Sequence, residues 1–206
     1  MAELRELTDL EIDALREVAS IGAGHAATAL SQMIERTVMI SVPTVRIVPL
    51  EEAGQLVGRP DDIIAAVLMH MMGDLTGRTL LVFPERAAKQ LCDILLRRPG
   101  GSTLTFAVME QSGLKEVGNI LSSAYFNALS DFMGMMLMPS IPSLVIDYSA
   151  AVLTSTTLDF GHERDAVLCV ETDLRVRDSE DKVTGHFILM PDVPSLRAIF
   201  DAVRLA

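Results

Sequence analysis

The sequence has few cysteines, no long apolar stretch and no run of basic residues. Its two cysteines, Cys92 and Cys169, lack metal-ligand spacing, and we expect them to be reduced core residues. No stretch approaches the roughly 18 consecutive apolar residues of a transmembrane helix, and the first residues lack signal-peptide character. A net charge of −11 without clustered Lys or Arg argues against a nucleic-acid-binding surface. We therefore expect a cytoplasmic protein that binds neither membranes nor nucleic acids.

Motifs of several common enzyme classes are also missing. The sequence contains no H-x-x-x-H zinc motif, no Walker loop and no G-x-S-x-G nucleophile elbow. Methionine-rich runs at 69–72 and 133–138 lack acidic or cysteine partners at ligand spacing, so we interpret them as core packing and expect no metal site. Residues 22–27 match G-x-G-x-x-A, but a dinucleotide-binding loop must follow a strand, and the preceding residues have a helical pattern. Small residues there would instead let a neighbouring element approach closely.

Apolar periodicity divides the chain into two halves. Hydrophobic residues make up 50% of the 206, enough for one large domain or two closely associated halves. Thr8 and Glu11 form a capping box that predicts a helix of about 25 residues. In residues 1–100 we expect this helix, strands at 44–50, 61–72 and 78–83, a helix at 84–96, and a short helix or loop at 51–58. In residues 101–206 we expect a helix at 105–133, strands at 143–148, 166–176 and 185–190, and a helix at 194–203.

The same order of elements in both halves indicates an internal duplication. Leu75-Thr76-Gly77 corresponds to Val183-Thr184-Gly185, so the repeat extends beyond the long helices. Three strands and their helices could not bury their faces alone, and joining the halves into one sheet solves this. We therefore predict an α+β fold: a single domain, 1–206, in which two pseudo-twofold-related α-β-β-β-α halves share a largely antiparallel sheet. We expect a monomer, because the duplication supplies a twofold partner within the chain.

Each predicted long helix carries one stripe of polar residues. Positions i, i+4 and i+7 of a helix fall on one face, because successive residues turn by about 100°. Ser112, Glu116 and Asn119 form such a stripe in the second half. Leu114, Val117 and Leu121 occupy the opposite face, which is typical of a helix buried on one side. The polar stripe is therefore expected to face outward.

The first half contains a matching stripe. Asp13, Glu17 and Ser20 precede the first set by 99 residues, and a proline follows each stripe at the same offset: Pro43 in the first half, Pro142 in the second. This pattern resembles the CheC-type chemotaxis phosphatases, which include CheX and FliY, and the resemblance covers nearly the whole chain. The second copy matches fully. The first departs at Ser20, where the family usually has Asn.

The resemblance implies hydrolysis of the aspartyl phosphate on a CheY-like response regulator. The regulator supplies its own Mg²⁺, so the phosphatase needs no cofactor, and what it adds is a positioned water. Asn119 is the expected water-holding residue, and Glu116 is expected to dock by pairing with the regulator's active-site lysine. Ser112 and Asp13 would shape the edge of each stripe, while the two prolines would set a helix-to-strand turn.

The resemblance leaves two alternatives, one for the first stripe and one for the protein as a whole. Glu17 could still dock, but Ser20 is shorter than Asn and lacks its amide, so we expect the first site to be weak or inactive. The alternative to an enzyme is a largely non-catalytic adaptor that binds the regulator, the receptor deamidase CheD, or both. The family binds CheD, and a complex with it is an expectation from the resemblance alone.

Overall fold

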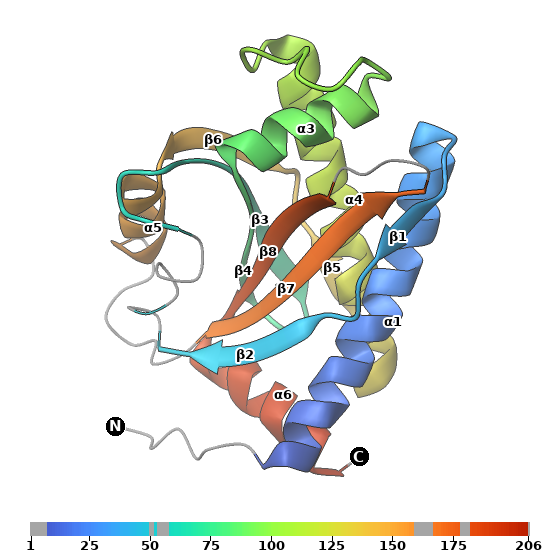
Figure 1. The fold of residues 1–206 in the computed structure, drawn as a ribbon. Helices are drawn as coiled ribbons and strands as arrows, with labels where there is room; N and C mark the ends of the chain where they lie inside the picture. The colour runs from blue at the N-terminus through green and yellow to red at the C-terminus, as the bar shows by residue number, and fades with distance from the viewer. Residues whose placement is uncertain (1–7, 50–51, 53–57, 159–166, 178–181, 206) are drawn as a thin grey trace.

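The structure is a computed structural model, which describes residues 8–49, 52, 58–158, 167–177 and 182–205. Its elements run in a similar order in the two parts of the chain (Figure 1). The first half contains α1 (Asp9–Ile34), β1 (Val38–Ile40), β2 (Thr44–Val48), β3 (Ile63–Gly73), β4 (Gly77–Pro84) and α3 (Glu85–Leu95). The second contains α4 (Val108–Met133), β5 (Leu137–Pro139), β6 (Ser143–Tyr148), α5 (Ser149–Leu158), β7 (Val167–Val176), β8 (Lys182–Pro191) and α6 (Val193–Leu205).

All eight of these strands join one antiparallel sheet. The order along it is β1-β7-β8-β4-β3-β5, with β2 also paired to β7 and β6 also paired to β3. The pattern is unchanged when the halves are exchanged, because β1 and β2 of the first half pair with β7 of the second, just as β5 and β6 pair with β3. The central contact, β4 with β8, joins the two halves. The sheet therefore cannot form from either half alone.

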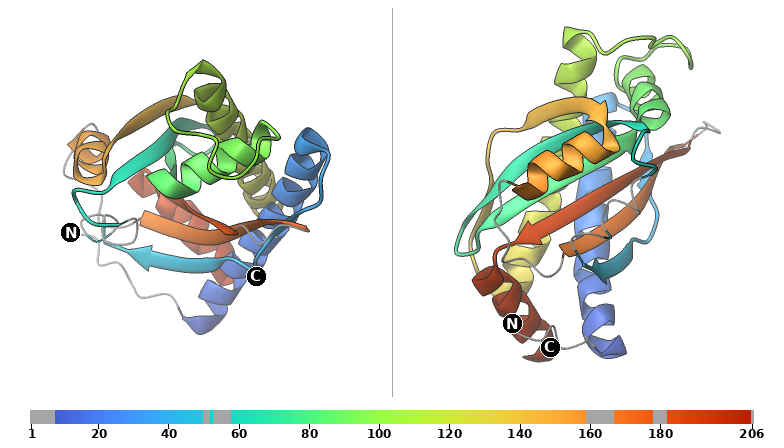
Figure 2. Two further views of the ribbon diagram at one scale, coloured as in Figure 1. Left: turned by 45° about the horizontal axis from the view of Figure 1, so that its top comes forward. Right: turned by 90° about the vertical axis from the view of Figure 1, so that its left-hand side faces the viewer.

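The helices cover the two faces of the sheet unequally. The long helices α1 and α4 lie side by side and antiparallel against one face (Figures 1 and 2). A large apolar cluster joins them to α3, α6 and the facing strand residues, with Phe83, Leu114, Phe126 and Ile199 among its most buried side chains. On the opposite face, α5 packs through Val152 onto a smaller cluster from β3, β4, β7 and β8. The long helices are therefore held along their length.

The predicted α+β class with an antiparallel sheet and two long helices is confirmed. The structure adds one short strand to each half, β1 and β5, which have three residues each and are too short to show strand alternation. It also adds α5, whose Ser- and Thr-rich sequence has low helix propensity. The segment predicted as a short helix or loop at 51–58 lies outside the described residues, apart from Glu52 and Gly58.

Helix α1 begins where the capping box predicts. The Thr8 hydroxyl accepts a hydrogen bond from the Glu11 backbone N–H, and the Glu11 carboxylate accepts one from the Thr8 N–H. Among the described helices, none combines the length and apolar character that crossing a bilayer would require.

The glycine-containing segment 22–27 lies in the middle of α1, which excludes the strand that a dinucleotide-binding loop requires. A Cβ added at Gly22 would lie 2.6 Å from Tyr125 Cδ1 and 3.1 Å from Tyr125 Cα on α4. The Tyr125 ring cannot easily retreat, because it stacks on Phe187 with 4.8 Å between ring centroids. No atom lies within 4 Å of a Cβ at Gly24. Gly22, and not Gly24, therefore allows the two long helices to approach.

This difference predicts opposite effects for two similar substitutions. Gly22→Ala should lower the free energy of unfolding by about 1–3 kcal/mol, because the new methyl overpacks the contact with Tyr125. Gly24→Ala adds the same methyl in open space and should raise it by up to about 1 kcal/mol through helix propensity. Urea unfolding of the two variants checks this, and equal effects would contradict it.

Candidate functional site

The stripe predicted on the second long helix lies on the outer face of α4. Ser112 and Glu116 are exposed and Asn119 is half-buried, whereas Leu114 and Val117 on the opposite face are fully buried. Among the described residues, the Glu116 and Asn119 side chains have no hydrogen-bond or ion-pair partner within the protein. One turn of helix therefore presents an uncommitted carboxylate and an uncommitted carboxamide to an approaching molecule.

The height of α4 above the sheet is set by Gly118, which lies between the two stripe residues. A Cβ at Gly118 would lie 2.5 Å from Val67 Cγ1 on β3. The helix backbone thus rests directly on β3, the strand next to one edge of the sheet, and a side chain larger than hydrogen would lift it. Because Asn119 is the next residue, its position relative to the rigid sheet is fixed by this contact.

Each long helix is also anchored at its N-terminal end by an arginine. The Glu110 carboxylate in the first turn of α4 accepts a hydrogen bond from Arg98, and its pKa is held below the ordinary value by backbone N–H donation and by Arg98. At the corresponding position of α1, Glu11 pairs with Arg204 of α6 at 3.0 Å. Both long helices therefore have a first-turn glutamate that is paired with an arginine outside the helix.

The stripe on α1 differs from that on α4 in how its polar groups are used. Asp13 and Glu17 are exposed and Ser20 is half-buried. The Asp13 carboxylate pairs with Arg16, and the Ser20 hydroxyl donates a hydrogen bond to the Arg16 carbonyl at 2.8 Å. Such back-bonding to the preceding turn is common for serine in helices. Two of the three side chains in this stripe are therefore engaged by their own helix.

The two prolines do not lie at a helix-to-strand turn, because a short strand intervenes in each half. Pro43 lies between β1 and β2, and Pro142 between β5 and β6. The preceding serine bridges the gap in each case: Ser41 exchanges hydrogen bonds with the Asp173 backbone, and Ser140 with the His70 backbone, all at 2.9–3.0 Å. Each proline thus marks a joint between two strands that pair with the same neighbour. No hydrogen bond or ion pair of the described residues links either proline joint to a stripe.

The cysteines are buried and free, as expected for reduced core residues. Burial raises the pKa of Cys92 to about 12 and that of Cys169 to about 11, so neither thiol is poised as a nucleophile. Among the described residues there is no group of three or more His, Cys, Asp or Glu side chains that could hold a metal ion.

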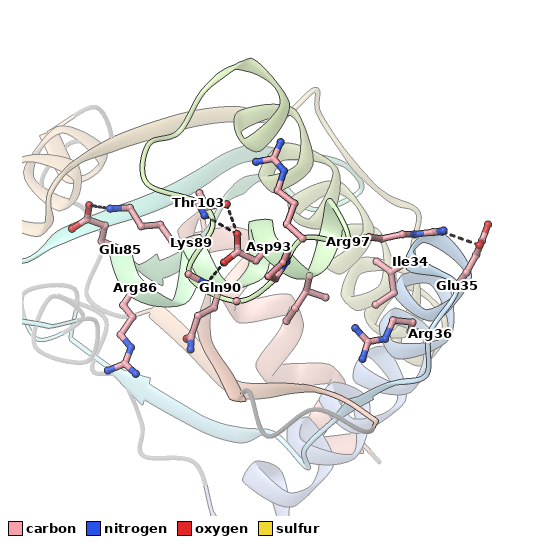
Figure 3. A pocket seen from close by; sticks show the side chains of 15 residues that line it. Ile34, Glu35, Arg36, Glu85, Arg86, Lys89, Gln90, Asp93, Arg97 and Thr103 are labelled. Atoms are coloured by element: carbon pink, nitrogen blue, oxygen red, sulfur yellow. Dashed lines mark hydrogen bonds and ion pairs between the residues drawn. The ribbon is translucent and has the colours of Figure 1, made fainter.

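Sequence patterns gave no indication of a charged hollow of about 1110 Å³ between the end of α1, helix α3 and the loop 97–103 (Figure 3). We call it the α3 hollow. It is lined by Ile34, Glu35, Arg36, Glu85, Arg86, Lys89, Gln90, Asp93, Ile94 and residues 97–101 and 103. Only the alternation of charges along α3 could have pointed to it, and such a pattern is more often just a solvated helix face.

Comparison with known proteins places the chain near one family. A model of the CheC-like family matches residues 10–47, which cover α1 and the first two strands. The CheY-P phosphatase CheC of Bacillus subtilis is 29% identical over 205 residues, 98% of each chain. The flagellar motor switch phosphatase FliY of the same species is 25% identical over 129 residues, 62% of this chain and 33% of FliY. The crystal structure of Thermotoga maritima FliY superimposes with a TM-score of 0.81 at 20% identity, covering 98% of this chain and 99% of that one.

These similarities concern the sequence of CheC and the fold of FliY. The fold is that of FliY, and the resemblance to CheC-type proteins predicted from the polar stripes and prolines is confirmed. The chain is thus similar to CheC-like proteins in sequence and to FliY in fold.

The anchor at the start of α4 predicts a pH dependence of stability. Because the folded-state pKa of Glu110 is lowered, its contribution is present above the unfolded value near 4.5 and is lost as the pH falls below it. Glu110→Gln should therefore lose less stability than the wild type between about pH 5 and pH 3. Urea midpoints measured across this range check it. Parallel curves for the two proteins would show that the carboxylate does not contribute in this way.

Proposed function

We propose that the protein is a phosphatase that hydrolyses the aspartyl phosphate of a CheY-like response regulator. Two relatives whose names describe CheY-P or motor-switch phosphatases support this reaction class. The observation that carries the proposal is the pair Glu116 and Asn119, one turn apart on a rigid helix and free of partners within the described protein. Such a pair suits a reaction that needs positioning more than new covalent chemistry.

Asn119 is the residue that orients the attacking water. Its carboxamide offers both a donor and an acceptor, so it can hold a water by one hydrogen bond while constraining its direction. In-line placement of the attacking oxygen is the main catalytic requirement of phosphoryl transfer, and a carboxamide performs this in GTPases. The half-buried setting of Asn119 and the Gly118 contact beside it limit how far the amide can move.

Glu116 is the docking residue. Its exposed carboxylate would pair with the lysine of the regulator's active site, and that ion pair would set the distance between Asn119 and the phosphoryl group. The regulator brings its own Mg²⁺, which neutralises charge on the phosphoryl oxygens. The phosphatase accordingly contributes no metal ligand in this scheme.

The stripe on α1 is a degenerate second site. Glu17 remains exposed for docking, but Ser20 has no amide and its hydroxyl already donates to the Arg16 carbonyl. A water bound at Ser20 could only donate a hydrogen bond to the hydroxyl oxygen, because the hydroxyl proton is already used. Turnover is therefore assigned to α4.

A second candidate function is a largely non-catalytic adaptor that binds the regulator, CheD, or both. The state of the α1 stripe favours it, since one of two similar surfaces has already lost the amide. Capture of the regulator without faster dephosphorylation would identify the adaptor.

Asn119→Ala should lower the catalysed rate of dephosphorylation by about 10²-fold or more, since removing a group that orients the attacking water costs factors of this size. The measurement is loss of radiolabelled phosphate from a phosphorylated regulator with Mg²⁺ present. Asn127→Ala is the matched control, because Asn127 is an exposed asparagine on the same face of α4, two turns or about 12 Å beyond Asn119. Equal activity of the two variants would exclude Asn119 from the reaction.

Restoring the amide to α1 tests the degenerate site. In an Asn119→Ala background, Ser20→Asn should raise turnover at least about tenfold, because α1 would regain a water-orienting group beside Glu17. Thr28→Asn controls for an added amide elsewhere, because Thr28 is exposed on the same helix and its hydroxyl also donates to the carbonyl four residues earlier. No gain from Ser20→Asn in a folded protein would show that the missing amide is not what limits α1.

A further inference from the structure

The α3 hollow concentrates positive charge in an otherwise acidic protein. Five of the chain's 17 Lys and Arg residues line it, together with three carboxylates, in a protein of net charge −11. The cations are Arg36, Arg86, Lys89, Arg97 and Arg98. Because the net charge repels anions at long range, a local excess of cations is where an acidic partner would be drawn.

The three carboxylates of the hollow are already engaged. Glu35 pairs with Arg97 at 2.9 Å, and Glu85 pairs with Lys89 at 2.7 Å. Asp93 is buried and accepts hydrogen bonds from the backbone N–H groups of residues 101, 102 and 103. Arg98 is paired with Glu110. Among the described residues, this leaves Arg36 and Arg86 with no ion-pair partner, and both are exposed.

The two unpaired guanidinium groups lie on opposite sides of the hollow, with the amide of Gln90 between them in the view of Figure 3. Guanidinium forks bind carboxylates and phosphates in bidentate fashion. Two well-separated guanidinium groups with an amide between them suit anionic groups that are spaced along an extended chain. The hollow is also lined mainly by charged and polar side chains, unlike the largely apolar pockets of drug-sized ligands.

Carboxylates fit this surface better than phosphate does. Phosphate sites are commonly built from backbone N–H groups that converge on the anion. In the α3 hollow, the N–H groups of Gly101, Ser102 and Thr103 converge instead on Asp93, a resident carboxylate. The loop is thereby held in place, but its donors are not available to a ligand.

The backbone provides separate support. Glu35 ends α1 in a left-handed conformation with φ 57°, whereas the corresponding residue after α4 is Gly134. Its partner Arg97 also has a positive φ, 53°. A positive φ destabilises a residue with a side chain by roughly 1 kcal/mol or more, and an exposed ion pair adds little stability. Local stability therefore does not account for the choice of Glu35 over glycine, and its side chain holds Arg97 at the rim of the hollow.

We propose that the α3 hollow binds an acidic protein segment, an extended Asp- and Glu-rich peptide whose carboxylates pair with Arg36 and Arg86 and whose backbone meets Gln90. This site is separate from the stripe on α4, which presents a carboxylate of its own. The proposal does not depend on phosphatase activity.

The test is fluorescence anisotropy of the 206-residue chain with labelled decapeptides of alternating Asp/Glu and Gly, and with an Asn/Gln version as a neutral control. The acidic peptide should bind saturably, and binding should weaken as salt is raised. Arg36→Gln combined with Arg86→Gln should weaken it at least about tenfold. Arg46→Gln combined with Arg175→Gln removes the same charge from exposed positions on β2 and β7, and should change affinity less than twofold.

Several outcomes would overturn the proposal. These are the absence of saturable binding, equal weakening by both double variants, or binding of pyrophosphate by a protein that does not bind the peptide. The last result would indicate a phosphate site. Gln90→Glu gives a second readout without removing a cation: it should weaken the acidic peptide by repulsion, and unchanged affinity in this folded variant would count against the site.

Discussion

The close packing of two antiparallel helices on one sheet is the constraint on which the rest of the structure depends. It is made possible by two glycines. Gly22 lets α1 approach Tyr125 on α4, and Gly118 lets α4 rest on Val67 of β3. Each glycine in a helix interior costs about 1 kcal/mol relative to alanine. These two glycines therefore lower helix propensity but allow the helix backbone to contact its neighbour. The result is a rigid support whose outer face can hold polar side chains at fixed positions without contributing to the core.

The two halves have kept the same scaffold and changed their surfaces. The same three devices occur in both: a helix of 26 residues, a glutamate in its first turn paired with an arginine, and a serine joint before a proline. The stripes differ in the residues that need not be kept for folding. In α1, Asp13 and Ser20 bond to Arg16 of their own helix, whereas among the described residues Glu116 and Asn119 of α4 have no such partner. Ser20 and Asn119 are both half-buried, so neither side chain belongs to the buried core that holds the two helices.

Much of this could be read from the sequence, because the signals were periodic or repeated. The capping box at Thr8, the apolar face at Leu114 and Val117, and the 99-residue offset led to the long helices, the fold class and the stripes. Strands β1 and β5 were missed because three residues carry no alternation, and the prolines were therefore assigned to the wrong kind of turn. The engagement of Ser20 and the α3 hollow could not be foreseen, since both depend on which side chains meet after folding.

The distribution of charge gives the two surfaces different selectivities. On α4, an exposed carboxylate would attract a lysine and repel acidic groups that approach in the wrong orientation. In the α3 hollow, the unpaired Arg36 and Arg86 would attract acidic groups and repel basic ones. The two surfaces are joined by one element, since Arg98 at the rim of the hollow pairs with Glu110 in the first turn of the helix that carries Glu116 and Asn119. Because Arg98 is held by the buried Glu110 carboxylate, a ligand of the hollow is left to Arg36 and Arg86.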